Sequence, residues 1–277
     1  MSLSVFIPDS VVSEDRTLRD KTLKLGYIAR ACSIFKVEKI YIYTDENGTF
    51  EKDFRLIKLI LGYIETPQYL RRSLFPKTEL LKEAGILPPL RTPPHKPYIP
   101  MASLKVGEVR EGVMLRKGGS LFVDIGLDSP IRYVGSGSDG ERVTIVLQQV
   151  QPSQICKRAL SDDIKEYWGY KVVRVGPIGK VLKGGFTGLK LITSRRGDPI
   201  NEVFRELIED MRKAINISLV FGSPKKGLYD ILREENLTPK EVGDYVINFI
   251  PNQGTATVRS EEAIISSLSI ISIMLKV

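Results

Sequence analysis

The feature that most constrains the fold is a proline-rich segment, residues 87–100 (LPPLRTPPHKPYIP), because the hydrophobic pattern changes across it. Proline fixes φ and has no amide donor, so this segment is neither a helix nor a central strand. We predict a stiff linker. Before it, apolar residues recur at helical spacing between short β runs; after it, they alternate as in half-buried strands.

The N-terminal part alternates strand and helix. Residues 4–7 and 39–43 are short β runs. Residues 18–35 and 53–64 each place their apolar residues on one helical face. This alternation predicts parallel strands joined by crossover helices.

Beyond the linker, four short β segments and two glycine-containing turns follow within about 70 residues, which predicts a small β-barrel. The α/β pattern then returns, and its continuous apolar strands are typical of a parallel sheet covered on both faces. The expected strands are 171–175, 189–193, 217–221 and 245–250, and the expected helices are 199–215, 226–233 and 261–275, the last with Ser260 as its N-cap. We therefore predict an α/β fold interrupted by an inserted barrel, with domain parts 1–92, 93–166 and 167–277.

The charge balance allows a polyanionic partner. The chain has 277 residues, 41 Lys and Arg against 33 Asp and Glu, and a net charge of +8. Most of the excess lies in residues 16–96, which hold 16 basic and 9 acidic side chains. Such a balance favours nucleic acid or an anionic surface, but solvated helix faces explain it equally well.

Several classes are excluded. Two cysteines, Cys32 and Cys156, are too few for a disulfide framework or a cysteine zinc site. The single histidine, His95, lies among prolines and rules out a histidine-based metal site, so we expect no metal. The N-terminus does not resemble a signal peptide, and the apolar C-terminus is too short to span a membrane. We expect a soluble, cytoplasmic protein with no membrane partner.

Two glycine-rich stretches are similar in sequence to nucleotide-binding motifs, but neither meets the requirements of its motif. Residues 135–140 (GSGSDG) fit the dinucleotide fingerprint, but a strand pattern follows where the fingerprint requires a helix, so we predict a hairpin loop. Residues 176–180 lack the spacing and the hydroxyl residue of a P-loop. A nucleotide-dependent enzyme is therefore disfavoured.

Three strand-to-loop junctions are more informative. Residues 191–197, 219–227 and 248–255 each leave an apolar strand for a loop of Gly, Pro, Ser, Thr or Asn. Ligands of open α/β sheets bind beyond the carboxyl ends of the strands, where such loops offer backbone hydrogen-bonding groups. Three loops could together bind one small polar ligand; the alternative is that these residues only form turns.

The third loop and its helix, FIPNQGTATVRSEEAIISSLSII, resemble the cofactor loop and C-terminal helix of the SPOUT superfamily of RNA methyltransferases. IARACSIF resembles the superfamily's first-helix signature. ETPQYLRRSLFP and VGEVREGVMLRKGGSLFVDIGL resemble its archaeal and eukaryotic branch, which carries an OB-like barrel and is proposed to methylate N3 of uridine in RNA. The resemblance implies a C-terminal trefoil knot, S-adenosylmethionine as cofactor, a homodimer, and RNA, with ribosomal RNA foremost, as substrate.

The resemblance also implies the site residues. At the three loops and the helix that follows them, it places the cofactor against Thr193, Ser194, Phe221, Gly222, Ser223, Pro224, Ile250, Pro251, Asn252, Gln253, Gly254, Thr255, Arg259, Glu262 and Ala263.

One catalytic candidate follows from the resemblance, and the others follow from the chemistry of uridine methylation. Arg30 matches the first-helix arginine of the ribose-methylating branch, but that branch's preceding asparagine is absent here. Uridine N3–H is weakly acidic and needs deprotonation or a cation that stabilises the anion. The candidates are Arg16, Arg30, Glu65 and Glu261, with Arg30 preferred. A non-catalytic RNA-binding or ribosome assembly factor remains the alternative, although the barrel has few aromatic residues for stacking.

Overall fold

The computed structural model describes residues 1–45 and 49–276, which form two compact units. The first comprises residues 1–62, 80–88 and 170–277, and the second comprises residues 63–79 and 89–169. The division into 1–92, 93–166 and 167–277 stays a prediction. Residues 63–79 belong to the same unit as the barrel, although they directly follow residues 1–62 of the first unit in the chain.

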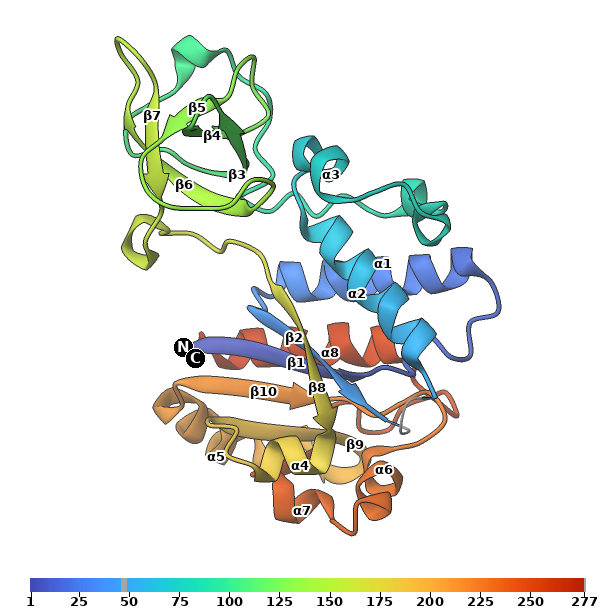
Figure 1. Ribbon diagram of the computed structural model, residues 1–277. Helices are drawn as coiled ribbons and strands as arrows, with labels where there is room; N and C mark the ends of the chain where they lie inside the picture. Colours follow the sequence, from blue (N-terminus) through green and yellow to red (C-terminus); the bar gives the residue numbers. More distant parts are fainter. Residues whose placement is uncertain (46–48, 277) are drawn as a thin grey trace. The chain divides into compact units, whose positions relative to one another are not determined.

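The first unit is built on a six-stranded sheet in the order β11-β9-β10-β1-β2-β8 (Figure 1). Every pairing in it is parallel. The strands are β1 (Ser2–Pro8), β2 (Lys39–Thr44), β8 (Lys171–Pro177), β9 (Leu189–Pro199), β10 (Asn216–Val220) and β11 (Tyr245–Asn248). β10 pairs with both β1 and β9, so strands from the two ends of the chain lie side by side in one sheet. The predicted parallel sheet is confirmed; the knot stays a prediction.

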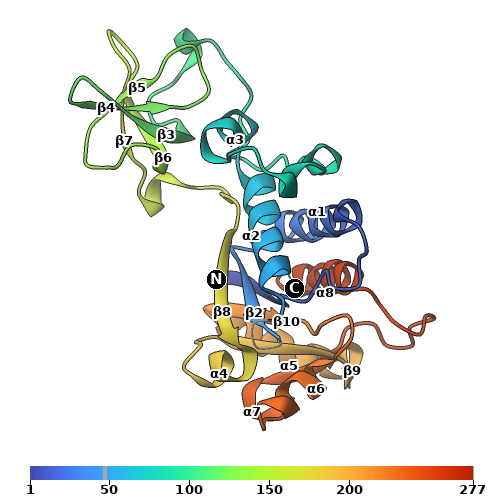
Figure 2. The same cartoon turned by 45° about the vertical axis from the view of Figure 1, so that its right-hand side comes forward.

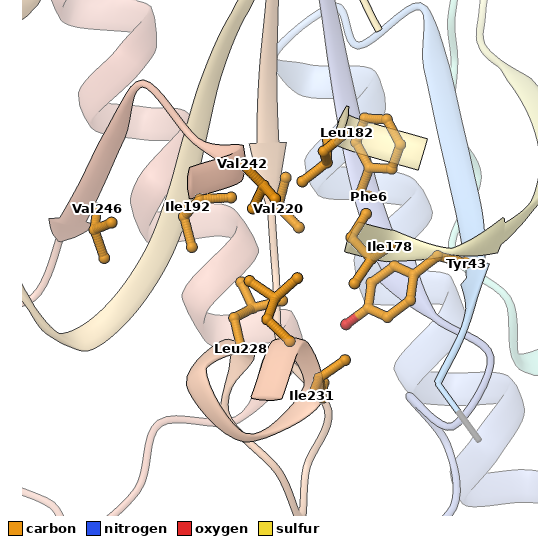
Figure 3. Close-up of a cluster of buried hydrophobic side chains, with 11 residues drawn as sticks. Phe6, Tyr43, Ile178, Leu182, Ile192, Val220, Leu228, Ile231, Val242 and Val246 are labelled. Atoms are coloured by element: carbon orange, nitrogen blue, oxygen red, sulfur yellow. The ribbon is translucent and has the colours of Figure 1, made fainter. Parts of the chain in front are cut away.

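Helices cover both faces of this sheet, as its continuously apolar central strands require (Figures 1 and 2). On one face α1 packs against α8. On the other, a hydrophobic cluster joins α4, α6 and α7 to five strands and includes Phe6, Tyr43 and Val220 (Figure 3). The helices of this unit are α1 (Leu18–Ile34), α2 (Glu51–Glu65), α4 (Ile178–Lys183), α5 (Ile200–Lys213), α6 (Leu228–Glu234), α7 (Pro239–Val242) and α8 (Ser260–Met274), with the last three residues of α2 in the second unit.

The second unit contains a closed barrel of order β3-β4-β5-β7-β6. Its core includes Met114, Val123, Ile131, Tyr133 and Cys156. The strands are β3 (Val109–Lys117), β4 (Ser120–Asp124), β5 (Ile131–Tyr133), β6 (Arg142–Gln149) and β7 (Ile155–Arg158); α3 (Gln68–Leu74) belongs to the same unit, and short 3-10 helices occur at Glu79–Leu81, Ala84–Ile86, Met101–Ser103 and Ser161–Asp163. The predicted small barrel is confirmed.

A buried polar network lies inside the second unit. The guanidinium of Arg142 donates two hydrogen bonds to Glu65, at 2.7 and 3.1 Å, and one of 2.7 Å to Glu111. Trp168 donates a 2.6 Å hydrogen bond to Glu111, and a ring nitrogen of His95 lies 2.7 Å from the carbonyl of Glu65. Glu65 is thus engaged in holding residues 63–66 to β3 and β6. Its catalytic role stays a prediction.

Most predicted elements are present, with displaced ends. Residues 88–100 contain no helix or strand, as the prolines predict. The GSGSDG stretch is followed by the strand β6, where a dinucleotide-binding fingerprint requires a helix. The prediction that this stretch is not such a fingerprint is therefore confirmed. It is not a hairpin, however, because β7 lies between β5 and β6 in the barrel. Cys32 and Cys156 are both buried and free.

Candidate functional site

The first of the three loops is an excursion inside β9. The pairing of β9 with β11 jumps from Ile192 opposite Val246 to Asp198 opposite Ile247. Residues 193–197 are therefore extruded from the ladder, which corrects the expectation that the strand ends at 193. A Cβ atom on Gly197 would lie 2.6 Å from the carbonyl oxygen of Val246, so only glycine allows this close passage.

The first loop is tied to the second at the end of β10. The hydroxyl of Thr193 donates a 2.8 Å hydrogen bond to the carbonyl of Val220. The buried Tyr43 hydroxyl donates a 2.8 Å bond to the carbonyl of Phe221, whose own N–H donates to the carbonyl of Phe6. These three bonds come from β9, β2 and β1, and they fix the point at which the second loop begins.

The second loop closes on itself. The N–H of Ser223 donates to the carbonyl of Lys226, and the N–H of Lys226 donates back to the Ser223 hydroxyl at 3.0 Å. A Cβ atom on Gly222 would lie 3.0 Å from the Lys226 carbonyl, so this loop has little room for a side chain there. Gly222, Ser223 and Pro224 are half-buried, and Phe221 is buried.

Arg195 joins the first loop to the third. Its guanidinium donates a 2.8 Å hydrogen bond to the carbonyl of Ala256, and its own carbonyl accepts a 3.3 Å bond from the side chain of Asn248. The next residue, Arg196, lies over the ring of Tyr229 at 5.6 Å. Sequence reasoning missed Arg195; the charged run directly after an apolar strand was the only signal.

The third loop is shaped by its own side chains. The carboxamide of Asn248 accepts a hydrogen bond from the N–H of Ile250, and Gln253 donates a 2.8 Å bond to the carbonyl of Thr255. Asn252 has a left-handed φ of 59°. A Cβ atom on Gly254 would meet nothing within 4 Å, so the loop is open there. Ile250, Pro251 and Gln253 are half-buried, whereas Asn252, Gly254 and Thr255 are exposed.

The start of α8 lies directly beyond this loop. The N–H of Arg259 donates a 2.9 Å hydrogen bond to the carboxylate of Glu262, so Arg259 is the N-cap and Ser260 the first helical residue, which corrects the predicted cap. Ala263 is half-buried one position on. The Oε2 atom of Glu261 is buried and accepts no hydrogen bond from the part of the chain that the structure describes. A buried carboxylate oxygen of this kind suits a ligand that brings a donor.

Arg30 lies away from the three loops of its own chain. Arg30 is half-buried in α1, twelve residues beyond the start of the helix, hence about 18 Å along its axis. Because α1 returns antiparallel to β1, Arg30 lies toward the amino ends of the strands, and the three loops lie at the carboxyl ends. Arg16 is exposed in the connection before α1. Glu261 directly follows the third loop in the chain, and the connection that holds Arg16 follows the carboxyl end of β1.

Two aspartates, Asp9 and Asp45, directly follow the neighbouring strands β1 and β2. Asp9 is 2 % exposed and accepts a 3.2 Å hydrogen bond from the N–H of Asp45, whose carboxylate accepts a bond from the hydroxyl of Ser10. Burial raises the pKa of Asp9 to about 6, and the nearby Asp45 carboxylate acts in the same direction. Asp9 is therefore a proton-binding group in the mildly acidic range at this edge of the sheet.

An open cavity of about 460 Å³ lies at the opposite edge, between the starts of β9 and β10 and the end of α5. Asp210, Lys213 and Asp244 line it. It is thus separate from the three loops. Among residues 1–45 and 49–276, no helix is long and apolar enough to cross a membrane, and no cluster of three potential metal ligands occurs.

Comparisons with known proteins agree with this arrangement. Residues 2–271 match the family described as "Putative RNA methyltransferase". An uncharacterized protein of Halobacterium salinarum is 32% identical over 97% of this chain and 98% of its own length. The human 28S rRNA (uridine-N(3))-methyltransferase is 32% identical over 97% of this chain and 77% of its length, and the Drosophila melanogaster protein of the same name is 28% identical over 97% and 61%. The chain belongs to this RNA methyltransferase family.

Proposed function

We propose that this protein transfers a methyl group from S-adenosylmethionine to N3 of a uridine in RNA, with ribosomal RNA as its substrate. The family match and the activity in the names of the human and Drosophila relatives support the reaction. The observation that carries the proposal is structural: the excursion at 193–197 in β9 is hydrogen-bonded to the end of β10, where the second loop begins, and to the third loop after β11.

The loop residues fit such a cofactor. S-adenosylmethionine, when bound, supplies an activated methyl group and carries both a sulfonium charge and an ammonium group. Among the residues that the structure describes, Glu261 has a buried carboxylate oxygen that accepts no hydrogen bond. Gly254, in the loop before this helix, leaves open space. The residues proposed to hold the cofactor are those of the three loops with Thr193, Phe221, Gly222, Ile250, Gln253 and Thr255 at their centre, followed by Arg259, Glu262 and Ala263.

The chain's own residues then have two tasks. The first is alignment of the uridine base with the methyl group, which rigid loops provide by removing motion from the reacting atoms. The second is the N3 proton. Glu261 can accept it, and an arginine can stabilise negative charge on the flanking carbonyl oxygens through paired donors. We assign that arginine to Arg30, with Arg16 as the substitute.

The position of Arg30 requires a second copy of the chain. It lies about 18 Å along α1 from the edge that carries the loops. On the α1 and α8 face, Tyr27, Ile34 and Ile273 are 54%, 50% and 60% exposed, which is unusual for large apolar side chains on neighbouring helices. Pairing two copies through this face would cover them and bring Arg30 of one copy toward the loops of the other. We therefore propose a homodimer.

Calorimetric titration of S-adenosylmethionine into the protein tests the cofactor. The proposal predicts saturable binding and release by S-adenosylhomocysteine. RNA binding without any cofactor binding would identify a non-catalytic RNA-binding or assembly factor instead. Absence of both would reject the function altogether.

A further inference from the structure

We propose that Tyr43 is a positioning residue for the cofactor: its buried hydroxyl fixes the peptide between Phe221 and Gly222 so that the N–H of Gly222 faces the cofactor. The inference rests on the proposed function, because it assumes that the second loop binds S-adenosylmethionine. It goes beyond that function by assigning a role to a residue of β2, a strand that contributes to none of the three loops.

The second loop begins where the connections of the sheet diverge. From β1 the chain continues through α1 to β2 on one side, and from β10 it continues through α6 and α7 to β11 on the other side. β1 and β10 are neighbours, and α1 covers one face of the sheet while α6 and α7 cover the other (Figure 1). In open α/β sheets, ligands bind beyond the carboxyl ends of the strands at such a switch point. The peptide that follows Phe221 therefore lies where a ligand is expected.

Tyr43 reaches this peptide from two strands away. Its side chain is fully buried, and its hydroxyl donates a 2.8 Å hydrogen bond to the carbonyl of Phe221, 178 residues later in the chain. β1 lies between β2 and β10 in the sheet, so the ring passes the intervening strand. Its hydroxyl points toward Leu228 and Ile231 of α6, the helix that follows the second loop (Figure 3).

The hydroxyl of Tyr43, and not its ring, is what needs an explanation. Tyr43 lies in the apolar cluster that joins α4, α6 and α7 to the sheet, where phenylalanine would fill the same space. A hydroxyl buried in such surroundings costs stability unless it finds a hydrogen-bond partner. Burial raises the pKa of the Tyr43 hydroxyl well above its ordinary value, and the carboxylates of Asp45, Asp9 and Glu235 act in the same direction. The hydroxyl therefore stays protonated and serves as a permanent donor.

This hydrogen bond sets the direction of a second donor. The peptide bond between Phe221 and Gly222 is trans, so its carbonyl and its N–H point in opposite directions. Because the carbonyl points to Tyr43 in the core, the N–H of Gly222 points away from the core. This N–H donates no hydrogen bond to any residue that the structure describes, and Gly222 is half-buried. A backbone donor in this position suits an acceptor atom of a ligand.

The backbone on both sides of the peptide is also held. Before it, the N–H of Phe221 donates a 3.0 Å hydrogen bond to the carbonyl of Phe6 in β1. After it, a Cβ atom on Gly222 would lie 3.0 Å from the carbonyl oxygen of Lys226, so the loop returns closely over this residue. The Tyr43 hydroxyl supplies the remaining constraint, which is the orientation of the peptide plane itself.

The test compares Tyr43→Phe with Tyr41→Phe by calorimetric titration of S-adenosylmethionine and S-adenosylhomocysteine into the full-length chain. Tyr41 is a matched control because it lies on the same strand, packs against the same cluster and stacks on Phe6 with the ring centroids 4.5 Å apart. Its hydroxyl forms no hydrogen bond with the part of the chain that the structure describes. Both variants keep the aromatic ring, and their melting transitions are measured alongside.

Tyr43→Phe should bind both ligands about tenfold more weakly, the scale for loss of one well-placed hydrogen bond, and Tyr41→Phe should bind them as the wild type does. The two ligands should lose equally, because they share their acceptor atoms and differ in the sulfonium charge. With RNA as substrate, Tyr43→Phe should raise KM for S-adenosylmethionine and leave kcat unchanged. A purely structural role would lower the melting transition of Tyr43→Phe without changing the affinity of the folded protein, and that result would overturn the inference.

Amide hydrogen exchange, followed by NMR on the wild type, tests the inference without any variant. The N–H of Gly222 should exchange at least about tenfold more slowly when S-adenosylmethionine saturates the protein, because it then donates to the ligand. Unchanged exchange at Gly222, with binding confirmed by calorimetry, would overturn the role of Tyr43 and leave the cofactor site in place. Absence of cofactor binding by the wild type would instead reject the proposed function, and this inference with it.

Discussion

The guanidinium of Arg195 donates a 2.8 Å hydrogen bond to the carbonyl oxygen of Ala256, across 61 residues of sequence. Its backbone carbonyl accepts a second bond, from Asn248. One residue of the first loop thus holds the third loop at both its beginning and its end. Together with the hydrogen bond from Thr193 to Val220, which joins the first loop to the start of the second, this relationship makes the three loops a single structural feature.

Replacing Arg195 should loosen the third loop. Arg195→Ala removes a hydrogen bond from a charged donor, and we expect S-adenosylmethionine to bind about tenfold more weakly, with the melting transition little changed. Arg195→Lys should recover part of the loss, because a lysine can reach one carbonyl but lacks the rigid fork. Calorimetry measures both. An unchanged cofactor affinity in Arg195→Ala would show that the third loop does not need this contact.

Gly254 offers a test with little structural cost. A side chain there meets nothing within 4 Å, so Gly254→Val should fold normally and yet occupy space beside the proposed cofactor. Gly222→Val should also block binding, but its side chain would press on the Lys226 carbonyl and distort the second loop. We expect no measurable cofactor binding by Gly254→Val. If a folded Gly254→Val binds as tightly as the wild type, the third loop is not the cofactor loop.

Arg30 should act across the dimer. Arg30→Ala should lower the single-turnover rate roughly a hundredfold, the scale for loss of one anion-stabilising donor, and leave cofactor affinity unchanged. Lysine should rescue poorly.

Subunit mixing distinguishes action in trans from action in cis. Alone, Arg30→Ala should keep about a hundredth of wild-type activity and Gly254→Val none. An equal mixture should recover about a quarter of wild-type activity, because half of the dimers are hybrids with one complete site. No recovery after confirmed subunit exchange would contradict action in trans. A monomeric wild-type protein in solution would contradict the dimer itself.

Asp9 should make stability depend on pH. Its pKa in the folded protein is raised to about 6 from 3.8, so the folded state binds the proton more tightly than the unfolded state. The free energy of unfolding should therefore fall as the pH rises from about 4 to about 6, and the loss persists above that range. Asp9→Asn keeps an acceptor for the Asp45 N–H and removes the charge. It should be more stable than the wild type at pH 7.5 by roughly 2–3 kcal/mol, and equal to it near pH 4.

Denaturant unfolding at several pH values measures this difference. Ser10→Ala is a matched control, since it removes a neighbouring contact to Asp45 without removing a charge at position 9. A pH slope that is the same in Asp9→Asn and the wild type would show that Asp9 is ionised normally.

The hydrophobic pattern predicted the sheet and the barrel because both depend on local periodicity. The continuous apolar runs of β1 and β10 reflect their continuous burial, and the alternation at the start of β6 reflects burial of every second side chain. In β3, by contrast, the first six residues are all buried, Arg110 and Glu111 included. Short elements escaped prediction, including β7, α3 and α4, because four to seven residues hold too little periodicity. The end of β9 was misplaced because its extrusion at 193–197 depends on β11, which lies about fifty residues later in the sequence.

The site was foreseeable only in outline. Gly, Pro and Asn after apolar strands indicated the three loops, but nothing local connects Arg195 to Ala256 or Thr193 to Val220. Glu65 is a second case: a carboxylate with catalytic potential in the sequence is held by Arg142 inside the barrel unit. Long-range side-chain contacts decided both cases.

The most direct test of the central claim is nucleoside mass spectrometry of ribosomal RNA after incubation with the protein and S-adenosylmethionine. The account predicts enzyme-dependent formation of 3-methyluridine, absent with Gly254→Val and strongly reduced with Arg30→Ala. Formation of a ribose-methylated nucleoside, or no methylated nucleoside from RNA that the protein binds, would contradict it.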